Sequence, residues 1–157
     1  MKLEELLQSL PADQWKVGQI YSFDWHDGPR AGVCSLAVPG GEFYFQMIDE
    51  RYNPDGLDDR IFRLSELPAG SVAEVLSVIP DLRSSDEAVR QKAERQLERI
   101  ENSRRPTSLV ILSQYMDYFE GCWHVDPART DKTDWFAVLG IAPREPASED
   151  QPTELRP

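Results

Sequence analysis

The stretch Gln19–Glu66, QIYSFDWHDGPRAGVCSLAVPGGEFYFQMIDERYNPDGLDDRIFRLSE, decides the fold of this chain. Its centre, Glu42–Ile48, alternates in side-chain type, so that Phe43, Phe45 and Met47 would share one face. Aromatic and branched residues with a period of two are typical of a β-strand. We therefore predict a strand over 42–48, with its neighbours arranged around it.

Three further strands flank this central one. They are predicted over about Gln19–His26, Ala31–Val38 and Arg60–Leu64. The sequences Asp27-Gly28-Pro29 and Pro39-Gly40-Gly41 between them are turn signals. Because short turns join antiparallel neighbours, residues of about 19–66 predict a β-meander in a curved antiparallel sheet.

Residues 71–101 change to a helical period. Ser71 with Glu74, and Ser84 with Glu87, match the capping-box pattern at the start of a helix. Pro80 is expected to stop the first helix, and the second should run from Ser85 to Asn102. The second helix has one narrow apolar stripe, which predicts that it lies on the sheet. That packing leaves no face that demands a dimer, so we expect a monomer.

Strand signals return after the helical stretch. Leu109–Leu112 is a short apolar run typical of a central strand, and residues 115–125 alternate again. Phe119, Trp123 and Val125 would then share one side. Residues 135–141 are apolar and fit either a strand or a short helix, so both alternatives stay open.

The whole pattern predicts a single α+β domain over residues 1–141. Its sheet would combine the meander of about 19–66 with strands of about 109–125, packed with two or three helices. One of these is a short helix over residues 3–10, where leucines recur at helical spacing. Residues 142–157 are rich in proline and acid and predict a disordered tail.

The chain is acidic. Its 157 residues hold 28 Asp and Glu against 17 Lys and Arg, a net charge of −11. An acidic surface repels nucleic-acid phosphates and anionic lipid and attracts basic partners, although solubility alone is an equally simple interpretation. The sequence shows neither an apolar run that could span a membrane nor a signal-peptide pattern, so we expect a cytoplasmic protein without nucleic-acid or membrane partners.

The densest group of functional residue types is Asp24, His26 and Asp27. On an extended strand Asp24 and His26 share a face, and a carboxylate beside a histidine is an arrangement used in general-base catalysis. These three residues are the candidate catalytic group of a small hydrolase or transferase. The alternative is structural: residues 27–29 form a turn, and Asp24 pairs with Arg30 across the hairpin.

Metal and thiol chemistry have weaker signals. Cys34, Cys122, His26 and His124 could supply four zinc ligands, but no pair has the close spacing that makes a zinc site specific. Cys34 shares a predicted strand face with Leu36 and Val38, which favours a core position over a reactive thiol. We predict neither a metal site nor a cofactor, because the sequence also lacks nucleotide-binding motifs.

The loop Asn53–Asp59 looks like a calcium loop. With Gly56 at the sixth position of an EF-hand, Arg51 would occupy the first and Phe62 the twelfth, and neither residue can bind calcium. The loop is therefore interpreted as an Asx-rich turn, and an irregular cation site there stays an open alternative.

Two main classes of function remain. The first is a binding module without catalytic activity, similar in charge and size to inhibitors or immunity proteins that bind a basic partner protein. Its candidate partner-binding residues are Asp24, Asp27, Arg30, Asp55, Asp58 and Asp59. The second is the small enzyme described above. A mimic of nucleic acid is a weaker third hypothesis, because the acids lie in short loop clusters and not along one long helix.

Overall fold

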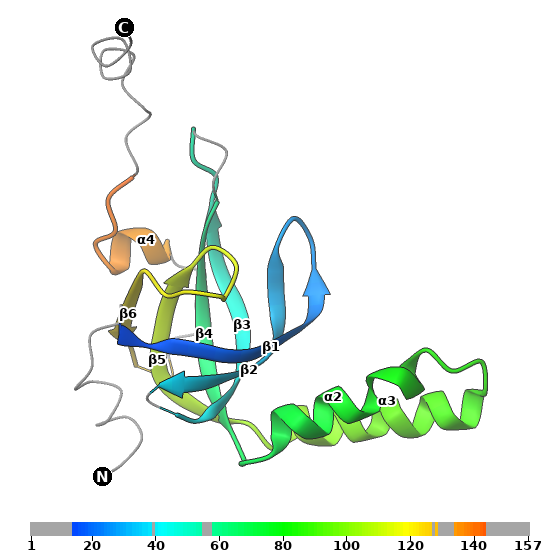
Figure 1. Ribbon diagram of the computed structural model, residues 1–157. Helices are drawn as coiled ribbons and strands as arrows, with labels where there is room; N and C mark the ends of the chain where they lie inside the picture. The colour runs from blue at the N-terminus through cyan, green and yellow to red at the C-terminus, as the bar shows by residue number, and fades with distance from the viewer. Residues whose placement is uncertain (1–13, 39, 55–57, 127, 129–133, 144–157) are drawn as a thin grey trace, which may run out of the picture.

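The computed structural model describes residues 14–38, 40–54, 58–126, 128 and 134–143. Along the chain the elements are β1 (Lys16–Trp25), β2 (Pro29–Val38), β3 (Glu42–Arg51), β4 (Asp59–Leu67), α2 (Ser71–Leu82), α3 (Glu87–Asn102), β5 (Arg105–Ser113), β6 (Gly121–His124) and α4 (Trp135–Val138). The six strands form one antiparallel sheet in chain order, which curls without closing (Figure 1). The predicted α+β class with a curved antiparallel meander is confirmed. The predicted N-terminal helix and residues 144–157 of the predicted tail lie outside the described residues.

The two faces of the sheet bury different sets of side chains. One face holds the largest cluster, in which Phe43 and Phe45 of β3 pack with Phe62 of β4 and with residues of β2 and β5. The opposite face packs Tyr44 against α2 and α3 at one end and Ile48 near α4 at the other. The alternation predicted for residues 42–48 is therefore confirmed, and it explains why β3 is central to both halves of the core.

Helix α2 begins and ends differently from the prediction. Its N-cap is Gly70, at a φ of 89°, and the Ser71 hydroxyl donates to the carbonyl of Pro68 instead of capping the helix. The capping acceptor is the Glu42 carboxylate on β3, which accepts from the backbone N–H groups of Gly70 and Val72. A carboxylate there also complements the positive end of the helix dipole.

The ends of the two helices correct two further predictions. Pro80 lies inside α2, which continues to Leu82, because a proline removes one hydrogen bond but still lets its own carbonyl accept from the N–H of Arg83. The N-cap of α3 is Asp86, whose carboxylate accepts from Ala88 N at 3.0 Å. Ser84 is therefore not the N-cap; its hydroxyl accepts from the N–H of Asp86, the residue that caps the helix.

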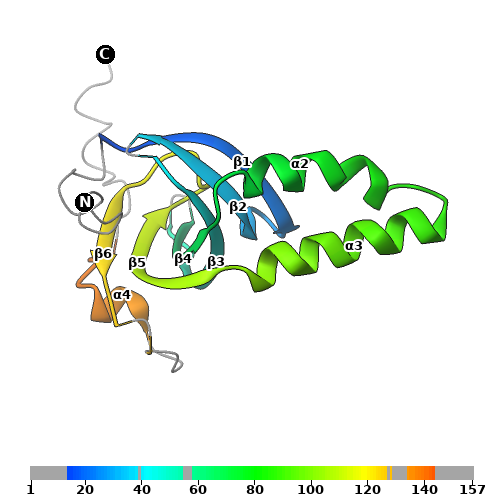
Figure 2. The same cartoon turned by 90° about the horizontal axis from the view of Figure 1, so that it is seen from below.

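Helices α2 and α3 form an antiparallel hairpin, residues 71–102, which we call the arm. The arm extends away from the sheet in both views (Figures 1 and 2). The prediction that α3 lies on the sheet is wrong for most of its length: α3 packs mainly on α2, and only its C-terminal part, with Leu97 and Ile100, joins the cluster that includes Val33 and Tyr44. The apolar stripe is thus satisfied by the other half of the hairpin.

The segment after β6 settles the alternative left open for residues 135–141. It forms the short helix α4, whose Trp135 and Phe136 are buried against β4 and β5. Asp134 caps this helix, and the guanidinium of Arg51 lies 4.3 Å from the centre of the Phe136 ring. None of the helices in the described part of the chain is long and apolar enough to cross a membrane.

We predict that Glu42→Ala lowers the free energy of unfolding by about 1–2 kcal/mol, the usual cost of a lost N-cap. Glu42→Gln keeps an acceptor oxygen but loses the charge, so its loss should be smaller. Urea denaturation measures both, with Glu94→Gln on the exposed face of α3 as the control. Equal stability of Glu42→Ala and the control would show that α2 does not depend on this cap.

Candidate functional site

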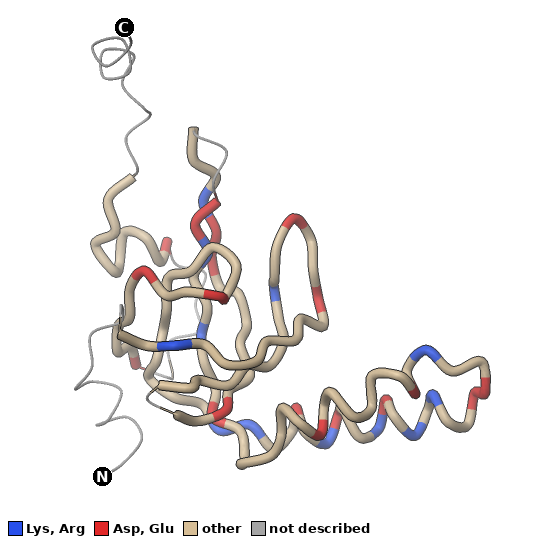
Figure 3. The backbone as a smooth tube through the Cα atoms, in the orientation of Figure 1, with Lys and Arg blue, Asp and Glu red and all other residues tan. Residues whose placement is uncertain are grey.

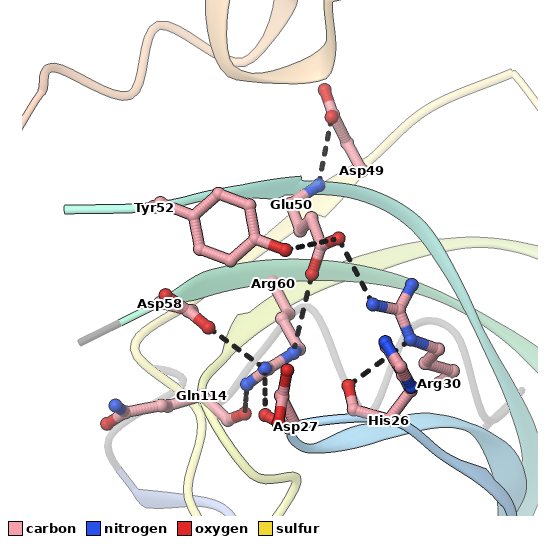
Figure 4. A network of polar contacts seen from close by, with 9 residues as sticks. All are labelled: His26, Asp27, Arg30, Asp49, Glu50, Tyr52, Asp58, Arg60 and Gln114. Carbon is pink, nitrogen blue, oxygen red and sulfur yellow. Dashed lines mark hydrogen bonds and ion pairs between the residues drawn. The ribbon is translucent and has the colours of Figure 1, made fainter. Parts of the chain in front are cut away.

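Arg60, at the start of β4, is a buried cation that joins three separate segments. Its side chain is only 1% exposed. Nη1 donates to the backbone oxygen of Gln114 at 2.8 Å, and Nη2 donates to the backbone oxygen of Asp27 (Figure 4). Nη2 also forms an ion pair with Asp58 at 3.2 Å. The β1–β2 turn, the ends of β3 and β4, and the loop after β5 are therefore held together by one guanidinium.

Glu50 on β3 extends this network. Its Oε1 accepts from Nη2 of Arg30 at 3.3 Å and from the Tyr52 hydroxyl at 3.4 Å. Its Oε2 lies 3.9 Å from Nε of Arg60, and neither of these two atoms has a hydrogen-bond partner within the part of the chain that the structure describes. Arg30 thus pairs with Glu50 and not with Asp24, which corrects the pairing suggested for the hairpin.

The turn Asp27-Gly28-Pro29 lets the Arg60 guanidinium approach the backbone. Asp27 has a φ of 54° and Gly28 a φ of 139°, both in regions that side chains disfavour. A Cβ on Gly28 would lie 2.6 Å from Nη1 of Arg60. The predicted turn is confirmed. Glycine is needed at position 28 for two reasons: its backbone has a positive φ, and a side chain there would collide with Arg60.

The candidate catalytic residues do not form a pair. Asp24, His26 and Asp27 are all exposed. His26 forms its hydrogen bonds through its backbone. Its N–H donates to the carbonyl of Gly28, and its own carbonyl accepts from Nε of Arg30. Within the described residues no hydrogen bond joins the side chains of Asp24 and His26, so the structure does not bring the proposed base and its orienting carboxylate together.

Two of the candidate partner-binding carboxylates are engaged inside the molecule. Asp58 pairs with Arg60, and Asp59, with a side chain 2% exposed, pairs with Arg51 at 3.1 Å. Nδ2 of Asn53 also donates to Asp59 at 3.0 Å, which ties together the two ends of the loop 53–59. Asp55 lies outside the described residues. Of the candidate carboxylates that the structure describes, Asp24 and Asp27 are the exposed ones.

Each of the three segments that Arg60 joins carries an exposed aromatic side chain. Trp25 is 62% exposed, Tyr52 69% and Tyr115 46%. The guanidinium of Arg60 lies 5.9 Å from the centre of the Tyr115 ring. We use the name Arg60 surface for Asp24, Trp25, Asp27, Tyr52 and Tyr115. These aromatics could not be grouped from the sequence, because the contacts of Arg60 that link their segments form only in the folded chain.

The cysteines and histidines do not support thiol or metal chemistry. Cys34 is buried, as predicted, and burial raises the pKa of its thiol to about 12. Burial also raises the pKa of the Cys122 thiol to about 12. Nδ1 of His124 is 2.7 Å from the Ser108 hydroxyl. Among the residues that the structure describes, no three Cys, His, Asp or Glu side chains are placed to hold a metal ion.

We expect Gly28→Ala to lower the free energy of unfolding by about 2–3 kcal/mol, because the methyl group adds a collision with Arg60 to the strain of a positive φ. Gly40→Ala is the matched control, since Gly40 has a φ of 112° but nothing within 4 Å of an added Cβ. Thermal and urea unfolding report the difference. If both variants lose the same stability, Arg60 does not press against the turn.

A second prediction concerns the thiols. A pKa of about 12 leaves about one thiol in ten thousand ionised at pH 8, so both cysteines should react slowly with iodoacetamide in the folded protein. Because the pKa is raised, the rate should keep increasing with pH above 9, where an ordinary cysteine levels off. Labelling followed by mass spectrometry, with and without denaturant, measures this. Rapid labelling of native Cys34 at pH 8 would contradict its burial.

Comparison with known proteins adds no relative. The chain matches no protein-family model, no curated protein and no solved structure.

Proposed function

We propose that this protein is a non-catalytic binding module that engages a basic partner protein through the Arg60 surface. One observation carries the proposal: the three segments tied together by Arg60 each present an exposed aromatic side chain, and the hairpin that carries Trp25 also carries the exposed carboxylates of Asp24 and Asp27. An inhibitor of a basic enzyme, as an immunity protein is, is one form of such a module. Action as a cytoplasmic monomer is part of the same proposal.

Exposed Trp and Tyr side chains are the residues that most often dominate binding energy at interfaces. They bury a large area and lose little conformational entropy, since each has only two side-chain torsions. Here the backbone that carries them is already fixed by the contacts of Arg60 and Glu50. Preorganised aromatics lower the entropic cost of association, which supports Trp25, Tyr52 and Tyr115 as anchors.

The carboxylates of the Arg60 surface have a different role in this proposal. Asp24 and Asp27 are exposed, whereas Asp58 and Asp59 are engaged by arginines. Exposed charges at the rim of an interface mainly raise the association rate and its sensitivity to salt. With a net charge of −11, the whole chain would attract a basic partner. The affinity would then come from the aromatics and the speed of encounter from the acids.

The hydrolase or transferase alternative gains no support from the described residues. A histidine that acts as a general base needs a carboxylate, or another polar group, within hydrogen-bond reach to orient its ring. His26 and Asp24 are open to solvent and share no hydrogen bond.

The proposal is tested by affinity capture from the source cells, followed by measurement of binding to the purified partner. Trp25→Ala should raise the dissociation constant about 30-fold, which corresponds to the loss of about 2 kcal/mol of binding free energy. Asp24→Lys should slow association several-fold at low salt and have little effect in about 0.5 M salt. Surface plasmon resonance separates the two rate constants.

Asp81→Lys is the matched control for Asp24→Lys, because Asp81 is also exposed but lies on the arm. This control should leave both rate constants nearly unchanged. The proposal fails if the captured partner is acidic, or if Trp25→Ala binds as tightly as the native protein.

A further inference from the structure

We propose that the arm carries a second interaction surface, a basic stripe on α3 made of Lys92, Arg95 and Arg99, which binds an acidic helical segment of another protein. This surface goes beyond the proposed function, because its charge and its place in the fold both differ from those of the Arg60 surface. The arm extends away from the sheet, and both basic and acidic positions lie along it (Figure 3).

The three cations occupy one face of the helix. Their spacing of i, i+3 and i+7 covers two turns, about 10 Å along the axis. Together with Gln96 they line a shallow hollow of about 290 Å³. Lys92, Arg95 and Arg99 are all exposed. The stripe is therefore accessible along its whole length.

The acids of α3 lie on a separate face. They are Glu87, Glu94, Glu98 and Glu101. The last three follow Glu87 by 7, 11 and 14 residues, a spacing that places all four along one line of the helix. Basic and acidic residues are interleaved in the sequence of α3, but the helical geometry places Lys92, Arg95 and Arg99 in one row and the glutamates in another, with Arg90 on the glutamate side. The first row is therefore a local positive surface.

Most of the positive charge on the stripe is not compensated by the protein itself. Among the described residues, Lys92 and Arg95 form no ion pair. Arg99 has one long contact with Glu74 of α2, at 3.7 Å, and its side chain is 73% exposed. Arg95 and Arg99 are also like charges at i and i+4, a spacing that destabilises an isolated helix slightly. An anionic partner would remove this repulsion.

The neighbouring acids decide what kind of anion fits. A nucleic acid or an anionic membrane presents phosphate over a wide area, which would also meet the glutamate row and the acidic body of the protein. A protein helix with Glu or Asp at i, i+3 and i+7 has a narrow acidic stripe of matching length. It can contact the basic row without contacting the acidic one, so charge complementarity favours a helical protein segment.

The test uses two fluorescent peptides of identical composition as probes. One places three glutamates at i, i+3 and i+7 of a helix, and the other spreads them around the helix. Fluorescence anisotropy with the native protein should show the first peptide binding at least about tenfold more tightly than the second. The triple variant Lys92→Glu, Arg95→Glu, Arg99→Glu should lose this binding by at least about tenfold.

Two controls separate this surface from the proposed function and from general charge effects. Glu94→Gln with Glu98→Gln changes the other row and should keep or strengthen peptide binding. Asp24→Lys changes the Arg60 surface and should leave the peptide affinity unchanged, so the two proposals can fail independently. Far-UV circular dichroism checks that each variant keeps its helices.

Three outcomes would overturn the proposal. The first is equal binding of the two peptides, which would reduce the stripe to a nonspecific cationic surface. The second is tighter binding of a single-stranded oligonucleotide or an anionic vesicle than of the striped peptide. The third is concentration-dependent self-association in sedimentation that the triple variant abolishes, which would make a second copy of this chain the occupant.

Discussion

A buried guanidinium controls one end of this fold. A charge removed from water is tolerated only when it is paired and hydrogen-bonded, so the chain must bring acceptors to Arg60. The acceptors are backbone oxygens of Asp27 and Gln114 and the carboxylate of Asp58. They come from three connections that are far apart in the sequence. The need to satisfy Arg60 therefore also fixes where these connections lie, and Gly28 leaves the space beside the turn that the guanidinium needs.

Adjacent residues of β4 organise the two sides of the sheet. Side chains alternate along a strand, so Asp59 points away from the Arg60 network. Asp59 pairs with Arg51, whose guanidinium also donates to the backbone oxygens of Ile141 and Ala142 and lies over Phe136. Arg60 thus holds the loops at the end of the sheet, whereas Asp59, through Arg51, holds the segment that follows α4. The acidic cluster at the start of β4 serves mainly as internal partners for arginines.

Local patterns predicted the strands, since alternation over 42–48 follows directly from the pleat of a strand. They failed where the partner is distant in the sequence. Glu42 caps α2 from β3, and Arg60 meets Gln114 only in the folded sheet. The candidate site was located in part: the turn with Asp24 and Asp27 lies at the Arg60 surface, but Tyr52 and Tyr115 were not grouped with it.

Net charge described this molecule poorly. A net charge of −11 predicts only a general attraction to basic partners, whereas the electrostatic field near a surface depends on which charges are paired and on how the rest are spaced. The carboxylates of Asp58 and Asp59 are paired with Arg60 and Arg51, so they add little to the negative field at the surface. Helical spacing collects three cations on one face of the arm. The same formal charge of −11 thus includes one surface with exposed acids and aromatics and another with a basic row. Each would select partners of the opposite sign, and the position of each charge, rather than their sum, determines which partner can bind.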